Sequence, residues 1–173
     1  MSKLHIRNFD STDLPFYTNC LLNQQWRLLY GEAEEPDDLS EFINRKTQGY
    51  PYVRRYIILK YGTNEKIGFA LVDFMEGGFQ ECIFAGGVKP DLIGKGYGVK
   101  CSIIFCQYIF QHFTSVNTIY SDYQNIFSQK ILLRIGFIED ESMNRLFDLQ
   151  NRLVLCKKSF PNSFCRKFLT GDT

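Results

Sequence analysis

The chain has 173 residues, which is enough for one domain with a substantial core. A hydrophobic content of 45%, a charged content of 23% and a net charge near +1 are ordinary for a globular protein and do not favour nucleic-acid binding. The apolar runs are too short to span a bilayer, and the N-terminus lacks the apolar stretch of a signal peptide. We therefore expect a cytoplasmic protein without a nucleic-acid or membrane partner.

Six cysteines are scattered along the chain without a Cys-x-x-Cys pair. This spacing indicates reduced thiols that mostly act as small apolar residues, and it does not favour a metal site. We expect no bound metal.

The first half of the chain predicts a strand, helices and a meander of three strands. Residues 4–7 alternate as a strand, and Asp10–Pro15 has the polar caps and early proline of a helix start. The acidic segment Glu32–Glu41 predicts a second helix start. Further strands are expected at 56–61, 66–74 and 79–88, with a hairpin turn at 62–65.

The second half predicts a helix, a strand, a helix and two last strands. These are expected at 99–113, 118–123, 128–135, near 144–149 and at 152–157. In the first of these helices, one inward face should contain Val99, Ile103, Cys106, Phe110 and Phe113. We predict an α+β domain over residues 1–160 with about four helices and a mostly antiparallel sheet of six to seven strands. Residues 161–173 are predicted to form a tail.

A glycine-rich segment stands between the strand ending at Val88 and the next helix. Three glycines alternate in Ile93–Gly98, so the backbone can turn sharply and present its N–H groups to a ligand. The helix that follows adds unpaired amides and the positive end of its dipole. The pattern predicts a phosphate-binding site. Because Lys95 is followed by Gly96, the segment does not fit a Walker loop, and its glycine spacing differs from a dinucleotide fingerprint.

A second segment, Asn125–Glu139, predicts a helix cap, a short helix and a Gly-Phe pair that opens a last hairpin. Together with Ile93–Gly98, this segment resembles the GCN5-related N-acetyltransferase superfamily, and most closely its branch of ribosomal-protein and spermidine N-acetyltransferases. The first position of the superfamily's phosphate loop is usually Arg or Gln, whereas here it is Ile93.

The resemblance implies the superfamily's fold, in which two central strands separate and acetyl-CoA lies between them. It also implies a possible homodimer. The implied cofactor-binding residues are Gly87, Val88, Ile93, Gly94, Lys95, Gly96, Tyr97, Gly98, Val99, Asn125 and Ser128.

Acyl transfer to an amine requires that the amine lose its proton, because an ammonium has no lone pair. The resemblance places the base on the strand before the loop, where Glu81 lies, and Asp73 and Asp122 are competing carboxylates. The departing coenzyme A thiolate needs a proton donor, and the tyrosine that has this role in many members of the superfamily is replaced here by Leu132. We therefore consider Ser128, beside Asn125, as a proton donor or as a second helix cap.

Tyr120 and Tyr123, on the strand beside the cofactor, are further candidates for the proton donor. Direct transfer in a ternary complex is favoured, because neither Cys82 nor Cys101 has a histidine nearby in the sequence to activate it.

The acceptor should be a small-molecule amine of the polyamine or aminosugar type, since the segment Glu32–Glu41 contains acidic but no basic residues. Its binding residues are expected to be Trp26, Tyr30, Glu34, Glu35, Asp73 and Tyr120. Two alternatives remain at this point: acetylation of a protein N-terminus, as in ribosomal-protein acetyltransferases, and a sensor that binds acyl-CoA without catalysis.

Overall fold

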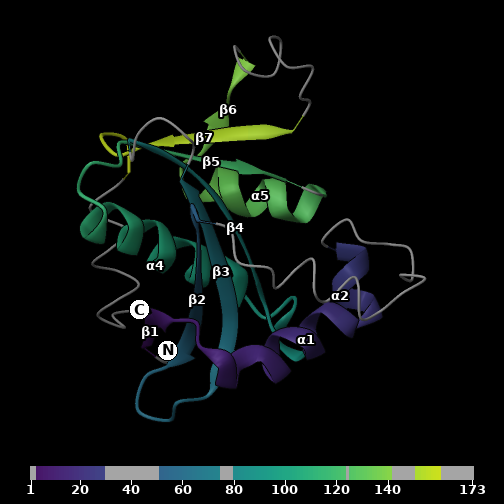
Figure 1. The fold of residues 1–173 in the computed structure, drawn as a ribbon. Helices are drawn as coiled ribbons and strands as arrows, with labels where there is room; N and C mark the ends of the chain where they lie inside the picture. The colour runs from purple at the N-terminus through teal and green to yellow at the C-terminus, as the bar shows by residue number, and fades with distance from the viewer. Residues whose placement is uncertain (1–2, 30–50, 75–79, 124, 142–150, 161–173) are drawn as a thin grey trace.

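The fold is a single sheet with helices on both faces, seen in a computed structural model that describes residues 3–29, 51–74, 80–123, 125–141 and 151–160 (Figure 1). The strands are β1 (Leu4–Asn8), β2 (Val53–Lys60), β3 (Lys66–Phe74), β4 (Glu81–Val88), β5 (Thr118–Asp122), β6 (Ile138–Glu139) and β7 (Arg152–Cys156). The helices are α1 (Leu14–Leu22), α2 (Gln24–Leu29), α4 (Tyr97–His112) and α5 (Ile126–Arg134), with 3-10 turns η1 (Ser11–Asp13) and η2 (Pro90–Leu92).

The sheet has the order β1-β2-β3-β4-β5-β7-β6, and only the β4–β5 pair is parallel. That pair is parallel because α4 carries the chain back across the sheet. The predicted α+β class and mostly antiparallel sheet are confirmed. The strand expected near 144–149 and the tail 161–173 lie outside the described residues. None of the described helices is long and apolar enough to cross a membrane.

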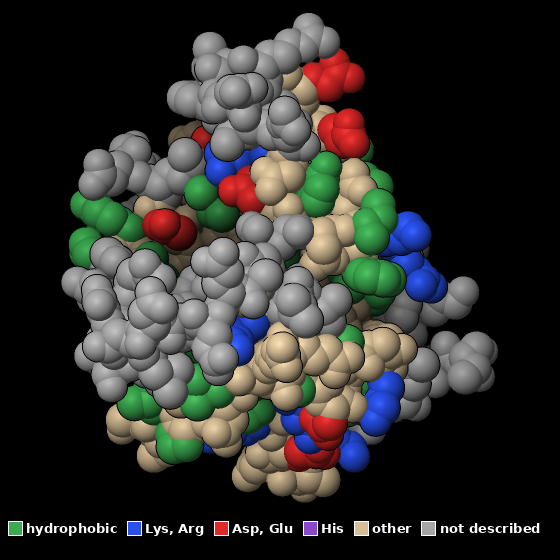
Figure 2. Space-filling model, turned by 90° about the vertical axis from the view of Figure 1, so that its right-hand side faces the viewer, with side chains coloured by type: hydrophobic (Ala, Val, Ile, Leu, Met, Phe, Trp, Pro, Cys, Tyr) green, Lys and Arg blue, Asp and Glu red, His purple; other side chains and the backbone are tan. Residues whose placement is uncertain are grey.

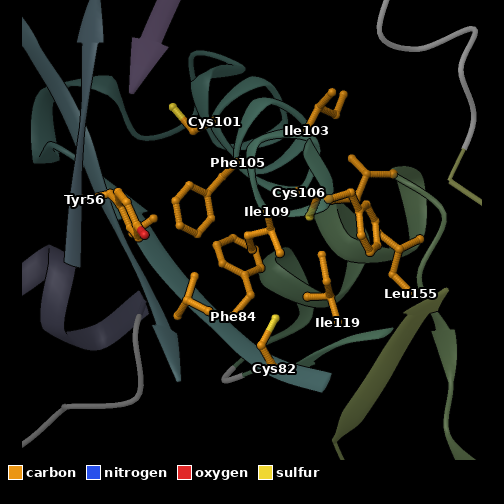
Figure 3. Packing of buried hydrophobic residues seen from close by; sticks show 14 of the residues in the cluster. Tyr56, Cys82, Phe84, Cys101, Ile103, Phe105, Cys106, Ile109, Ile119 and Leu155 are labelled. Atoms are coloured by element: carbon orange, nitrogen blue, oxygen red, sulfur yellow. The ribbon is translucent and has the colours of Figure 1, made fainter. Parts of the chain in front are cut away.

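Two apolar clusters cover the two faces of the sheet. The larger one packs α4 and α5 on one face, where Phe105 lies between the rings of Tyr56 and Phe84 at centroid distances of 5.3 and 5.4 Å (Figure 3). The smaller one packs α1 and α2 on the other face, where Trp26 lies 5.5 Å from the ring of Phe69.

The buried face of α4 is wider than the sequence predicts. Ile103, Cys106 and Phe110 are buried as expected, but Val99 and Phe113 are only half-buried against the core. The helix also buries Cys101, Phe105 and Ile109. A single stripe underestimates this face because the helix packs against both the sheet and α5.

A buried carboxylate joins the N-terminal elements. Asp13 is fully buried and accepts two hydrogen bonds from Arg7 on β1, at 2.6 and 2.7 Å, while Lys66 on β3 lies 2.8 Å away. Burial by itself opposes ionisation of Asp13, but the hydrogen bonds from Arg7 and Lys66 outweigh it and hold the pKa of this carboxyl well below its usual range.

Asp13→Asn should therefore lower the free energy of unfolding at neutral pH by about 1–3 kcal/mol, because a neutral amide accepts more weakly from Arg7 and Lys66 than the buried carboxylate does. Because the folded-state pKa is depressed, the carboxylate stabilises above its unfolded value of 3.8 and stops doing so as the pH falls further. Urea unfolding at pH 7 and pH 3 should show the gap between variant and wild type narrowing in acid. Asp10→Asn is the control, because Asn caps η1 as well as Asp does. A constant gap at both pH values would contradict this role.

Candidate functional site

The site begins where β4 and β5 separate. Their parallel pairing covers only three residue pairs, from Glu81 with Thr118 to Ile83 with Tyr120. Beyond this point the Ser121 hydroxyl donates to the Phe84 carbonyl at 2.9 Å, and β4 continues to Val88 without β5 beside it. The separation of the central strands, predicted from the resemblance, is present.

The separation exposes an edge of β4. The Lys89 N–H donates to Ile67 on the β3 side, at 2.8 Å, and backbone groups alternate in direction along a strand. The N–H and C=O groups of Gly86 and Val88 therefore point toward the gap, and those of Gly87 toward β3. The Val88 carbonyl accepts the Trp26 indole N–H at 3.0 Å. Gly86 thus offers both a donor and an acceptor to an extended ligand.

Two glycines allow the backbones of β3 and β4 to approach closely beside this edge. A Cβ on Gly86 would lie 2.7 Å from the Phe69 carbonyl oxygen, and one on Gly68 would lie 2.4 Å from the Gly87 carbonyl oxygen. Neither distance is tolerable between non-bonded atoms, and the obstacle is backbone in both cases. A side chain at either position would displace the strand that forms the edge.

The glycine-rich loop has the geometry of an anion site. Gly94 and Gly96 have φ angles of 77° and 78°, a region that side chains rarely adopt, and a Cβ on either would meet no protein atom within 4 Å. Gly96 is the N-cap of α4 and provides no side-chain cap. The first turn of the helix is therefore open to a ligand.

The amides of this loop divide into two groups. Those of Ile93 and Lys95 donate to carbonyls three residues earlier, both at 3.2 Å. The other four amides belong to Gly94, Gly96, Tyr97 and Gly98. Within the described part of the chain, these four N–H groups donate to no backbone carbonyl. This narrows the sequence prediction to four amides at the positive end of the α4 dipole, an arrangement that fits a diphosphate.

The β4 edge and the first turn of α4 line one cleft of about 450 Å³, which reaches from α2 to the gap between α4 and α5. Of the four residues with open amides, Gly98 is in its lining. Figure 2 shows the molecule from the side of α1 and α2, and the face is hollowed in its upper half between acidic, basic and hydrophobic side chains. The lining includes Trp26, Arg55, Gly86, Gly87, Val88, Gly98, Ser102, Ser121, Asp122, Ser128 and Leu132. The free N–H and C=O groups of Gly86 fit the pantetheine arm of coenzyme A. The open amides of the glycine-rich loop, which follows the same strand, fit its diphosphate.

Only one of the three candidate carboxylates lines this cleft. Asp122 does so at the end of β5, where Arg152 on β7 donates to both of its oxygens at 2.8 and 2.9 Å. These bonds orient the carboxylate and raise the pKa of the Arg152 guanidinium. Asp73 and Glu81 lie on the same face of the sheet, the face of α1 and α2, but both are exposed and neither lines the cleft.

Glu81 instead contacts Tyr120. The Tyr120 hydroxyl donates to Glu81 at 3.3 Å, and the ring lies 5.9 Å from the Arg152 guanidinium. Burial, with the neighbouring Glu81 charge, raises the pKa of Tyr120 to about 12. The hydroxyl therefore keeps its proton at neutral pH and is already committed to a carboxylate.

Asn125 and Ser128 form a capping box at the start of α5. The Asn125 side chain accepts from the N–H of Phe127 and of Ser128, at 2.8 and 3.0 Å. The Ser128 hydroxyl accepts from the Asn125 N–H at 3.2 Å and donates to its carbonyl at 2.9 Å. The helix cap predicted for Asn125 is confirmed, and Ser128 takes part in it while also lining the cleft. Leu132 lines the cleft as a buried apolar residue.

The thiols near the site are buried. Burial raises the pKa of Cys101 and of Cys82 to about 12, so neither is a thiolate at neutral pH. Among the described residues, no group of three or more His, Cys, Asp and Glu side chains could hold a metal ion.

The predicted acceptor residues are only partly described. Trp26 lines the cleft, whereas Tyr30, Glu34 and Glu35 lie outside the described residues. Gly86, Arg55 and Ser121 line the cleft without having been singled out. The adjacent glycines at 86 and 87 are a signal that could have identified Gly86. Arg55 and Ser121 have no such signal, because only the sheet places them at the gap.

Comparisons with known proteins agree with this geometry. Residues 3–138 match the model of a family described as an acetyltransferase (GNAT) domain. The fold is similar to a spermidine N-acetyltransferase from Vibrio cholerae solved with CoA and spermine, with a TM-score of 0.70, 18% identity, and coverage of 91% of this chain and 98% of that one. It is also similar to the aminoglycoside acetyltransferase AAC(6')-Ib solved with ribostamycin and coenzyme A, with a TM-score of 0.74, 16% identity, and coverage of 93% and 97%.

No curated protein matches the chain. The family match spans most of the described sheet, including the β4 edge and the glycine-rich loop. The chain therefore belongs to the GNAT family and is an N-acetyltransferase that uses acetyl-CoA.

Proposed function

We propose that this protein transfers the acetyl group of acetyl-CoA directly to a primary amine of a small molecule of the polyamine or aminosugar type. The observation that carries the proposal is the position of Asp122, a carboxylate in the cleft that Gly86 of the open β4 edge and Gly98 of the glycine-rich loop also line. The cleft volume of about 450 Å³ suits a small ligand. The similar structures were solved with spermine and with ribostamycin, both of which are small amines.

Each part of the cleft has a separate task in this mechanism. The open amides of the loop Ile93–Gly98 hold the diphosphate, and the backbone of Gly86 holds the pantetheine arm beside β4. When bound, acetyl-CoA supplies an activated thioester acyl group. Asp122 attracts the ammonium form of the acceptor and accepts its proton, so that the amine lone pair can form the new C–N bond as the C–S bond breaks. Arg152 holds Asp122 in position through its two hydrogen bonds.

Direct transfer is consistent with the state of the thiols. A route through an acyl-cysteine would need a cysteine thiolate. Because burial raises the pKa of Cys101 to about 12, this side chain is a neutral thiol at neutral pH. The departing thiolate takes a proton from solvent or from Ser128, which lines the cleft.

The acceptor class can be tested by incubating the protein with acetyl-CoA and three sets of amines, and following the release of free thiol. Polyamines or aminosugars should release thiol. Release with short peptides that carry a free N-terminus, and with no small amine, would instead support acetylation of protein N-termini.

Asp122→Asn should lower kcat/KM by about 100-fold, a usual contribution of a general base, while the affinity for CoA stays unchanged. Glu81→Gln is the matched control, because Glu81 lies on the same face outside the cleft and should lose much less activity. The measurements are thiol release and calorimetric CoA titration. If Glu81→Gln were the more damaging of the two variants, Glu81 would be the base.

Gly96→Ala should lower CoA affinity by about tenfold, because the side chain distorts the loop and stands among the phosphate-binding amides. Gly62→Ala is an unusually close control: Gly62 has a φ of 82° and, like Gly96, no protein atom within 4 Å of its Cβ position. Both variants should lose a similar amount of stability in urea. Equal CoA affinity in the two variants would argue against phosphate binding by this loop.

Ser128→Ala separates the two roles considered for Ser128. If Ser128 protonates the thiolate, kcat should fall by about tenfold or more with little change in CoA affinity. If it acts only in the capping box, the thermal midpoint should fall and kcat should not. Thermal unfolding and steady-state kinetics on one preparation distinguish these outcomes.

A further inference from the structure

The only tryptophan of the chain closes one end of the open β4 edge. The indole N–H of Trp26 donates to the Val88 carbonyl at 3.0 Å, and both residues are buried. An indole N–H is a donor only, so it satisfies a carbonyl and leaves neighbouring N–H groups unpaired. Trp26 therefore removes one acceptor from the edge and leaves its donors in place.

Three elements hold the indole in this position. The Trp26 backbone N–H donates to the Asn23 side chain at 2.9 Å, at the start of α2. The indole packs on Phe69 of β3, whose ring in turn packs edge-to-face on Tyr17 of α1 at a centroid distance of 4.6 Å. The indole cannot turn away from the Val88 carbonyl without breaking this packing.

The edge keeps three hydrogen-bonding groups for a ligand. Its first carbonyl, that of Phe84, accepts from Ser121, and its last, that of Val88, accepts from Trp26. The N–H and C=O groups of Gly86 and the N–H of Val88 remain, and within the described residues these three have no backbone partner. Gly86 therefore supplies the carbonyl to which an amide N–H of an extended ligand can donate.

The level of this carbonyl along β4 matters for the proposed reaction. Continued by two residues, the register of β4 with β5 places Asp122 at the level of Ala85. A cofactor arm that starts at the glycine-rich loop passes Val88 before it reaches Gly86 and Asp122. Because strand residues rise by about 3.3 Å each, pairing at Val88 in place of Gly86 would hold the arm about 6.6 Å nearer to the loop. The thioester would then stop short of the base.

We infer that Trp26 is a positioning residue that fixes the register of the pantetheine arm on β4. By occupying the Val88 carbonyl, it leaves the Gly86 carbonyl as the acceptor for the arm, and the thioester then reaches Asp122. The inference rests on the proposed function, since it requires the arm to lie along this edge. It differs from the contact with the acceptor amine that the sequence predicts for Trp26, and the two roles have different kinetic effects.

Trp26→Phe keeps an aromatic ring against Phe69 and removes the hydrogen bond to Val88. With saturating acetyl-CoA and the amine that releases thiol fastest, kcat should fall by about tenfold, because the thioester is misplaced in most complexes. The CoA affinity and the KM for the amine should change by less than about twofold, because the arm keeps an acceptor in either register. Calorimetry and steady-state kinetics measure these values.

Cys20→Ala is the control for loss of packing. Cys20 is buried in the same apolar cluster as Trp26, but it is not among the residues that line the cleft. Its variant should lower the thermal midpoint and leave kcat and CoA affinity unchanged.

Backbone NMR locates the arm without relying on activity. In wild type, CoA should shift the carbonyl signal of Gly86 more than that of Val88, because the Val88 carbonyl already has its donor. In Trp26→Phe, CoA should shift the Val88 carbonyl as well, because that carbonyl becomes available to the arm.

Failures of the two proposals can be told apart. Wild type that does not bind CoA would overturn the cofactor site and the proposed function. Wild type that binds CoA with the larger shift at Val88 would overturn the register role, and this outcome needs no variant. Trp26→Phe with the kcat of wild type would also overturn it. A variant that loses kcat and CoA affinity together would reduce Trp26 to packing, and a raised KM for the amine alone would assign it to the acceptor.

Discussion

The whole site depends on the early end of pairing between β4 and β5. A strand in the middle of a sheet normally forms backbone hydrogen bonds with two neighbouring strands. After Ile83, strand β4 has only β3 as a neighbour. The free side presents a donor and an acceptor at Gly86, which an extended amide ligand can satisfy as a strand would. The Ser121 hydroxyl donates to the Phe84 carbonyl at the start of this free edge, and the Trp26 indole N–H donates to the Val88 carbonyl at its end. The part of the β4 edge that stays open to a ligand is therefore short and centred on Gly86.

Rigid packing on both sides maintains this opening. On one face, Phe105 and its neighbours fill the space between α4 and the sheet, so α4 can hold its N-terminus toward the cleft (Figure 3). On the other, Phe69 packs against Tyr17 and Trp26, which brings α1 and α2 to the mouth of the cleft. The ion pairs of Asp13 tie this second layer to β1 and β3. Packing within the protein therefore positions both walls of the opening.

The sequence predicts local features of the site well. The alternating glycines place a turn and a helix start where Gly94 and Gly96 adopt positive φ, and Asn125 caps α5 as its residue type suggests. It is less informative about side chains that must meet across strands. The resemblance favours Glu81 as the base, with Asp73 and Asp122 as competing carboxylates, and the structure places all three on one face of the sheet. Nothing local distinguishes the one that lines the cleft.

The sequence by itself determined the glycine-rich loop, the helix that follows it and the cap of α5, because these features depend on contacts within a few residues of one another. Its motifs, through their resemblance to a known superfamily, also indicated the class of fold. Only the tertiary structure decided which carboxylate enters the cleft, which glycine exposes its backbone, and that Ile131 on α5 lies against Gly98 in the first turn of α4. Each of these depends on where two strands part or two helices touch, and such distances are set by the packing of residues far apart in the chain.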